Sequence, residues 1–308
     1  MKSLTRLLLA LSFAAMLPVS ALASTTIGVS MAHFDDNFLT TVRDAMATEG
    51  KAHNVNLDFE DAQGDVGRQV SQVESFVAQH VAAIIVNPAD ASATKRMTDA
   101  ARKAGIPIVY VNRKPDEPMG NGVYFVGSDS LVAGHLQMEY LAKALKGKGN
   151  IAIMLGELST DATRDRTRGV KDIVAKNPGI KVVEEQTANF DRSQGINLMS
   201  QWLSSGKKFD AIAANNDEMA LGALIAMKQA GVSPKNVLVG GVDATKEALN
   251  AMSRGDLAVT VFQDGRGQGK TAVDTAIKLA GGDKDVPKED WIPYQLVTPD
   301  NYRSFLNK

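Results

Sequence analysis

The stretch Phe209-Asp-Ala-Ile-Ala-Ala-Asn-Asn-Asp-Glu-Met-Ala-Leu-Gly-Ala-Leu224 decides the fold of this 308-residue chain. Its apolar run Ala211–Ala214 predicts a buried strand, and the next four residues are all polar. Apolar residues then recur at helical spacing, so the polar group lies where a strand ends and a helix begins. In an open α/β sheet, ligands bind in the crevice beyond the carboxyl ends of the strands. One of Asn215, Asn216 and Asp217 is expected to cap the helix, which leaves Asn216 as the better candidate for a ligand contact.

The same alternation of strand and helix repeats along the chain. Predicted strands lie at 26–31, 56–60, 83–86, 107–111, 123–126, 151–155, 181–185, 211–214, 237–241, 258–262 and 294–297. Predicted helices lie at 38–51, 70–77, 91–104, 131–145, 166–176, 194–203, 246–253 and 270–279, and after residue 218. Such alternation predicts an α/β fold with parallel sheets and right-handed crossovers.

The length and the number of these units favour two similar doubly wound parallel-sheet lobes rather than one wide sheet. We expect an N-terminal lobe of residues 24–128 plus 264–290 and a C-terminal lobe of residues 129–263 plus 291–308. No long Gly/Ser linker separates them, which indicates a short multi-strand hinge and a cleft that closes over a ligand.

The N-terminus and the composition indicate where the protein acts. Lys2 and Arg6 precede the apolar run 7–17, and Ala21-Leu22-Ala23 fits a small-x-small cleavage site. Residues 1–23 are therefore predicted to be a secretory signal peptide; the apolar run is shorter than the ~20 residues that span a bilayer. The absence of cysteine excludes disulfides and thiolate metal sites. A formal net charge of −1 without a dense basic block predicts no nucleic-acid partner.

Motifs of common enzymes are incomplete in this chain. The stretch Asp264-Gly-Arg-Gly-Gln-Gly-Lys-Thr271 resembles a phosphate-binding loop, but Asp264 stands where that pattern requires glycine, which predicts only a glycine-rich turn. The four histidines show no metal-ligand spacing and no Gly-x-Ser-x-Gly elbow occurs, so we expect neither metal nor cofactor. Asp36 and Asp243 could form a glycosidase pair, so an exported carbohydrate-active enzyme stays an alternative.

Polar and aromatic residues gather at several predicted strand ends. They are Phe34, Asp35, Asp36 and Phe38, then Asn112 and Arg113, then Arg164 in an arginine-rich segment, and finally Phe190, Asn216, Asp243 and Gln263. Individually, the aspartates could be helix caps and Phe38 a core residue. Together they predict a ligand site, because planar polar groups pair with adjacent hydroxyls and aromatic rings cover the C–H faces of a ring.

With these residues, the chain resembles the ribose-binding-protein family of periplasmic solute-binding proteins over nearly its whole length. The most specific segments are Asn-Asn-Asp-Glu-Met-Ala-Leu-Gly at 215–222, Asn-Phe-Asp-Arg at 189–192 and Asn-Pro-Ala-Asp at 87–90. The resemblance implies a type I periplasmic binding fold, a periplasmic location and a membrane ABC permease as partner, and we expect a monomer. Matching the family's ribose contacts by motif implies Phe38, Arg113, Arg164, Phe190, Asn216, Asp243 and Gln263 at the site.

Departures from the ribose pattern point to another ligand. Asp36 stands where the family usually has asparagine, Leu39 where it often has phenylalanine, and Asn112 where it has aspartate. Segments 31–38 and 110–115 look more like the inositol- and rhizopine-binding branch. We therefore expect an inositol-like cyclic polyol or a monosaccharide. Ribose or another pentose or hexose, and a role in presenting the ligand to a chemoreceptor, stay open.

Overall fold

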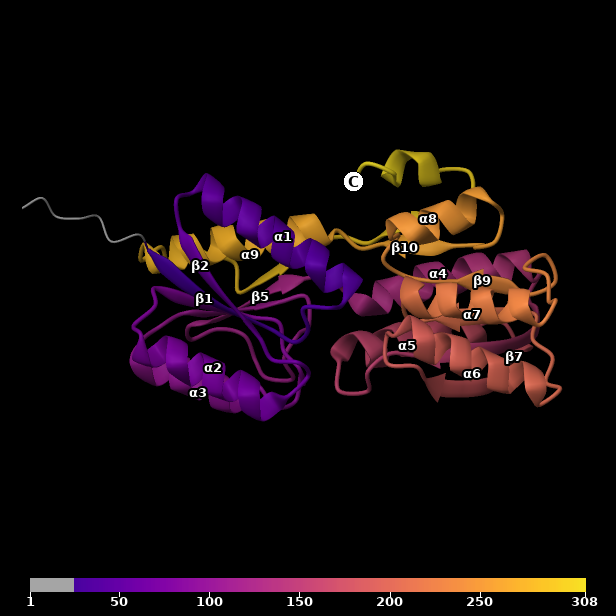
Figure 1. Cartoon of the computed structure of the whole chain (residues 1–308), viewed down its shortest axis with the longest axis horizontal. Coiled ribbons are helices and arrows are strands. Elements are labelled where there is room, and N and C mark those ends of the chain that lie inside the picture. The colour runs from indigo at the N-terminus through magenta and orange to yellow at the C-terminus, as the bar shows by residue number, and fades with distance from the viewer. Residues whose placement is uncertain (1–24) are drawn as a thin grey trace, which may run out of the picture.

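The computed structural model of this protein describes residues 25–308, which form two lobes side by side (Figure 1). Strands and helices alternate through almost all of that range, so the fold is the predicted α/β fold with parallel sheets. The predicted signal peptide, residues 1–23, lies outside the described residues. Among the helices of residues 25–308, none combines the length and the apolar character that crossing a membrane requires.

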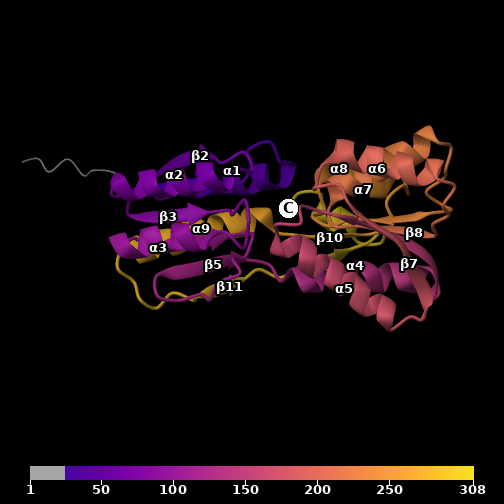
Figure 2. The same cartoon turned by 90° about the horizontal axis from the view of Figure 1, so that it is seen from below.

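The first lobe is built on a parallel sheet with the strand order β11-β5-β4-β3-β1-β2, and Figure 2 shows its two edge strands, β2 and β11, on opposite sides of the lobe. Its strands are β1 (Thr26–Met31), β2 (Asn56–Asp61), β3 (Ala83–Val86), β4 (Ile108–Val111), β5 (Val123–Gly127) and β11 (Glu289–Trp291). Helices α1 (Asn37–Ala52) and α9 (Gly265–Ala280) pack together on one face of this sheet, and α2 (Val66–Ala78) and α3 (Lys95–Ala104) on the other (Figure 1).

The second lobe repeats this plan on a parallel sheet with the order β7-β6-β8-β9. Its strands are β6 (Lys148–Leu155), β7 (Gly179–Thr187), β8 (Ala211–Ala214) and β9 (Leu238–Gly240). Helix α4 (Ser130–Ala144) packs with α5 (Asp161–Ala175), and α6 (Arg192–Ser204) packs with α7 (Asp217–Gln229). Helix α8 (Lys246–Ser253) lies beside α7 and contacts a short 3₁₀ helix, Tyr302–Phe305.

The chain passes between the two sheets three times. The first passage follows β5, and the second joins β10 (Thr260–Phe262) to α9. The third joins β11 to β12 (Gln295–Val297), which pairs antiparallel with β10. Isolated bridges from Gly240 to Val259 and from Asp243 to Phe262 attach β10 to the edge of the second sheet. Three adjacent segments therefore link the lobes, which is the arrangement of a hinge.

Both sheets are covered by apolar residues on two faces. In the first lobe, Val29 and Ile85 contact the cluster under α1 and α9, whereas Ile84 and Val86 contact the cluster under α2 and α3. Two further clusters cover the faces of the second sheet. Strands that are buried on both faces are the rule for parallel sheets, and they hold the carboxyl ends of the strands in fixed positions.

The sequence prediction differs from the structure at the start of several helices, and it misses one strand. Helix α5 begins at Asp161 rather than Arg166, because Thr160 caps it and accepts a hydrogen bond from Thr163 N at 3.2 Å. Helix α3 begins at Lys95 rather than at 91, and the three-residue strand β11 was not predicted.

Helix α9 corrects the prediction of a glycine-rich turn at 264–271. It begins at Gly265, because Asp264 caps it by accepting a hydrogen bond from Gly267 N at 2.8 Å. Its glycines allow α9 to lie close to α1: a Cβ added at Gly269 would lie 2.3 Å from the carbonyl oxygen of Val42. The glycines therefore serve helix packing.

Candidate ligand-binding site

A small cavity lies between the lobes, where the carboxyl ends of the strands of both sheets meet. Its volume is about 30 Å³. It is lined by Asp36, Phe38, Leu39, Asn112, Arg113, Ala162, Arg166, Phe190, Asn216, Asp243 and Gln263. Residues of both lobes therefore line one cavity.

Two larger outer cavities share lining residues with the inner one. A cavity of about 580 Å³ shares Asp36 and Phe190 with it and is also lined by His33, Asp35 and Glu157. A second, of about 290 Å³, shares Phe38, Asp243 and Gln263 with it. The inner cavity is thus bordered by open space on more than one side.

The first strand end contributes Asp36 and Phe38 to the inner cavity, but not all the residues that the sequence suggested. Asp36 caps α1, with Oδ1 accepting from Leu39 N at 2.7 Å, and burial raises the pKa of its carboxyl while Arg113 counteracts this. Phe34 does not line the inner cavity, because its ring packs against the Arg43 guanidinium, 4.3 Å from the ring centroid. Asp35 is exposed and lines only the larger outer cavity.

Asn112 and Arg113 follow β4 and reach the inner cavity from the first lobe. Asn112 has a left-handed backbone, with φ of 67°, which asparagine tolerates better than most residues. Its side-chain amide donates to Gln268 Oε1 at 3.1 Å, and this bond fixes its orientation. Arg113 is buried and donates through Nη1 to the carbonyl oxygen of Pro88 at 3.2 Å.

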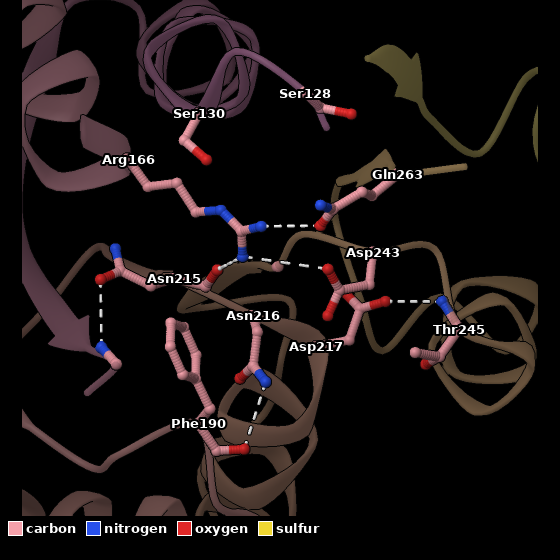
Figure 3. Close-up of polar contacts among 12 residues, drawn as sticks. Ser128, Ser130, Arg166, Phe190, Asn215, Asn216, Asp217, Asp243, Thr245 and Gln263 are labelled. Carbon is pink, nitrogen blue, oxygen red and sulfur yellow. Dashed lines mark hydrogen bonds and ion pairs between the residues drawn. The ribbon is translucent and has the colours of Figure 1, made fainter. Parts of the chain in front are cut away.

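The arginine of the second lobe in the cavity is Arg166, not Arg164, and this corrects the sequence prediction. Arg164 is 44% exposed and forms an ion pair with Asp116. Because α5 begins at Asp161, residues 164 and 166 project from different sides of one helix. Arg166 is buried and donates to Asn215 O at 2.6 Å and to Gln263 Oε1 at 2.7 Å, as Figure 3 shows. The arginine-rich segment in the sequence does not fix the helical phase that separates these two arginines.

Phe190 is held by an unusual backbone at the end of β7. Asn189 and Phe190 have φ angles of 52° and 59°, a region that non-glycine residues rarely adopt. The Phe190 ring lies directly over Gly156, where an added Cβ would lie 2.1 Å from the ring. Figure 3 shows the ring projecting toward the Arg166 side chain, whose guanidinium carbon is 6.0 Å from the ring centroid.

Asn216 both caps α7 and lines the cavity. Its Oδ1 accepts from Met219 N at 3.0 Å, and its Nδ2 donates to the carbonyl oxygen of Phe190 at 3.2 Å. One of Asn215, Asn216 and Asp217 was expected to cap the helix, and the cap is Asn216 itself. An amide nitrogen carries two hydrogens, so Nδ2 retains one for a further partner.

Asp243 lies at the end of β9 and opposite Arg166. Its Oδ1 is 3.8 Å from Arg166 Nη1. Burial raises the pKa of the Asp243 carboxyl well above its ordinary value of 3.8, and Arg166 only partly counteracts this. Gln263 lies in the passage from β10 to α9, so one lining residue belongs to the hinge itself.

Polar contacts between the lobes lie beside the outer cavity of about 580 Å³. Glu157, from the second lobe, accepts from Arg113 Nη1 at 2.9 Å and lies 3.2 Å from His33 Nε2. We call these three residues the interlobe cluster. Burial alone would raise the pKa of Glu157, but Arg113 and His33 together lower it. Sequence reasoning missed Glu157 and His33; the available signal was their position just after predicted strands.

The lining of the inner cavity is balanced in charge and rich in hydrogen-bonding groups. Two carboxylates, Asp36 and Asp243, stand with two guanidinium groups, Arg113 and Arg166. Such a set suits a neutral ligand with many hydroxyl groups, since each charged group can bond hydroxyls without an opposite charge on the ligand.

A separate cluster on the surface, Glu49, His53 and Asp274, offers three groups that metals bind. Lys270 Nζ lies 2.6 Å from Glu49 and 3.1 Å from Asp274. An ammonium group therefore already compensates these carboxylates, and their arrangement has an explanation without an ion.

Two α/β lobes that close through a three-segment hinge on a polar cavity define a two-lobed solute-binding protein. The chain belongs to the periplasmic binding protein domain family, whose sequence model matches residues 27–284. The resemblance drawn from the sequence is thereby confirmed.

Three proteins similar to the chain carry a ligand in their name or were solved with one. A protein of Rhizobium meliloti named "Putative rhizopine-binding protein" is 47% identical over 300 residues, which cover 96% of this chain and 97% of that protein. The ribose import binding protein of Bacillus subtilis is 33% identical over 89% of this chain and 87% of its own length. An ABC transporter solute binding protein from Bacillus halodurans, solved with bound myo-inositol, is 45% identical, with a TM-score of 0.88 over 92% of this chain and 98% of that one.

Proposed function

We propose that this protein is a periplasmic receptor that binds an inositol-like cyclic polyol between its lobes and delivers it to an ABC importer. The observation that carries the proposal is the convergence of Asp36, Arg113, Arg166, Asn216 and Asp243 from both lobes on one cavity. An inositol has a hydroxyl on every ring carbon, so adjacent hydroxyls can pair with planar carboxylate, amide and guanidinium groups. The similarity to a protein solved with myo-inositol supports this ligand class.

The two aromatic side chains have a complementary role in this proposal. Phe38 from the first lobe and Phe190 from the second both line the inner cavity. Their rings would cover the C–H faces of the polyol while the polar groups bind its rim. A ligand that touches both lobes binds the closed form more tightly than the open form, and this difference in affinity shifts the equilibrium toward closure.

The route and the partner follow from the same proposal. Residues 1–23 would direct export and be removed, and the mature chain would act as a monomer in the periplasm. We propose that the lobes are residues 24–128 plus 264–290 and residues 129–263 plus 291–308. The pairing of β11 with β5 and of β12 with β10 supports this division, although Trp291, the last residue of β11, still pairs with Gly127 of the first lobe. A membrane permease would bind the closed form.

Ligand release without chemical change is part of the proposal. Asp36 and Asp243 both face the inner cavity, so a carbohydrate-active enzyme is the rival class. Incubation with polyols and glycosides, followed by chromatography, should recover every compound unaltered. A new product would favour the enzyme.

Calorimetry and thermal melting of the mature protein test the ligand class. We expect binding of one or more inositol isomers, with weaker binding of ribose and hexoses. A ligand at 100 times its dissociation constant stabilises the folded protein by ~2.7 kcal/mol. Asp243→Asn should weaken binding at least ~tenfold, since a charge-assisted hydrogen bond contributes ~1.5–3 kcal/mol, while circular dichroism stays unchanged. A wild-type protein that binds none of these compounds would refute the proposal.

A further inference from the structure

The turn that carries Asp243 has a backbone that needs support. Asp243 and Ala244 have φ angles of 118° and 54°, and neither is glycine. Residues in such conformations persist only where the surrounding structure imposes them. Because Asp243 contributes a carboxylate to the inner cavity, whatever holds this turn also sets the direction of that carboxylate.

The supporting contacts come from Asp217, the first residue of α7. Asp217 is fully buried, and its Oδ2 accepts from Thr245 N at 2.8 Å, the bond drawn beside Asp243 in Figure 3. Its Oδ1 accepts from the Thr260 hydroxyl at 2.7 Å, and that hydroxyl oxygen accepts from Ala244 N at 3.1 Å. Asp217 therefore holds two successive backbone amides of the turn, one directly and one through Thr260.

A role only in stabilising its own helix does not explain these contacts. An acidic residue in the first turn of a helix is favourable on electrostatic grounds alone. However, Asn216 already caps α7, and both Asp217 oxygens bond to other segments. Gly241 leaves room for them, since a Cβ added there would lie 2.2 Å from Asp217 Oδ1. Burial raises the pKa of Asp217 to about 7, which means that burying the ionised carboxylate is unfavourable. An acidic residue that only stabilised the helix N-terminus could be exposed to solvent and would not carry this cost.

We propose that Asp217 is a positioning residue that, with Thr260 as relay, holds the turn of residues 243–245 and aims the Asp243 carboxylate into the cavity. This inference rests on the proposed function, because the direction of Asp243 matters to binding only if the cavity takes a ligand.

The first test compares two substitutions at Thr260 by calorimetry with the inositol isomer that the wild type binds. Thr260→Val removes the hydroxyl but keeps the shape, so two hydrogen bonds are lost, and affinity should fall about tenfold or more. Thr260→Ser keeps the hydroxyl and should stay within about threefold of the wild type. Asp217→Asn provides an independent variant. Its side-chain NH₂ would face either Thr245 N or the Thr260 hydroxyl, both of which donate to Asp217 in the wild type, so one hydrogen bond would be lost and binding should weaken similarly.

A double-mutant cycle separates positioning from general damage to the lobe. In the Asp243→Asn background, Thr260→Val should cause little further loss of affinity, because the group that it positions is already changed. Additive losses would overturn the inference. Equal affinities of Thr260→Val and wild type would also overturn it, while leaving the proposed function intact. A wild type that binds no polyol would overturn both.

Discussion

At the scale of the residue, single side chains in this site serve the fold and face the cavity at once. Asp36 caps α1 and Asn216 caps α7, and both line the inner cavity. A cap fixes the rotamer, so the atoms that remain for a ligand are held in place before binding, and less conformational entropy is lost on binding. From the sequence alone, capping a helix and contacting a ligand look like alternative roles for one side chain. In the structure, Asp36 and Asn216 cap a helix and also line the cavity.

Arg164 and Arg166, two of the three arginines of α5, provide a matched pair for a prediction. Arg166 donates to Asn215 O, Gln263 Oε1 and the Tyr294 hydroxyl, a forked pattern that a lysine cannot reproduce. Arg166→Lys should therefore weaken polyol binding at least ~tenfold, the loss of a charge-assisted bond. Arg164→Lys alters an exposed ion pair worth ~0–1 kcal/mol and should change affinity less than about threefold. Calorimetry measures the polyol affinity of both variants. Equal losses of affinity would contradict the inference that Arg166, and not Arg164, contacts the ligand.

At the scale of the element, glycines bring helices of the second lobe close together. A Cβ added at Gly222 of α7 would lie 2.4 Å from the Arg192 carbonyl oxygen of α6. A Cβ added at Gly134 of α4 would lie 2.1 Å from the carbonyl oxygen of Arg166 itself. These contacts are between backbones, so they leave no flexible side chain to move aside. The positions of α5 and α7, which carry Arg166 and Asn216, depend on them.

Gly222→Ala should therefore destabilise the protein by ~1–3 kcal/mol, as overpacking does in other cores. Gly281→Ala is the control, because an added Cβ there has ordinary contacts of 3.4 Å and longer. That control should leave stability unchanged or slightly higher, since alanine lowers the entropy of the unfolded chain. Urea denaturation measures both free energies of unfolding. A Gly222→Ala protein as stable as the wild type would show that α6 and α7 can separate freely.

The sequence predicts the presence of helices and strands better than it predicts the residue at which each helix begins. The residues of the candidate site illustrate the physical reason. The apolar runs that become β1, β3 and β8 are set by burial, and their predicted bounds agree with the structure. The start of α5 depends on one capping bond at Thr160, which apolar periodicity does not reveal. Arg164 was placed at the site by matching the family's motif, and only the helical phase set by that cap shows that Arg166 lines the cavity instead. Phe34 was assigned to the site for a similar reason: the direction of a short turn is not encoded in periodicity.

At the scale of the whole molecule, the two lobes meet through polar contacts around the cavity. Besides the interlobe cluster of His33, Arg113 and Glu157, Asn37 Nδ2 donates to Glu218 Oε1 at 3.0 Å. Each of these bonds joins residues more than 40 positions apart, so no local pattern in the sequence indicates them. Because they exist only when the lobes are together, they favour the closed form whatever the ligand contributes.

The interlobe cluster predicts a pH dependence of binding. The hydrogen bond to Glu157 is the main cause that raises the pKa of His33 above its ordinary value of 6.5; burial and Arg113 oppose it, and Asp35 adds to it. Protonated His33 thus favours closure. This contribution is complete below the ordinary pKa and is lost as pH rises through the raised value of the closed form. Affinity for the polyol should fall by roughly two- to tenfold from about pH 6 to pH 8.5, a modest effect because the pair is partly exposed.

His33→Gln isolates this effect from the other carboxyls of the cavity. Glutamine can still donate a hydrogen bond to Glu157 but carries no proton that is lost in this range. Burial is the main cause that raises the pKa values of Asp36 and Asp243, and it acts in both proteins, whereas His33 is the smallest of the causes acting on Asp36; most of their titration therefore cancels in the ratio of dissociation constants. Calorimetry across the range should therefore show that ratio changing with pH, with the wild type losing its advantage as the solution becomes alkaline. Parallel profiles would mean that the proton on His33 does not contribute to closure.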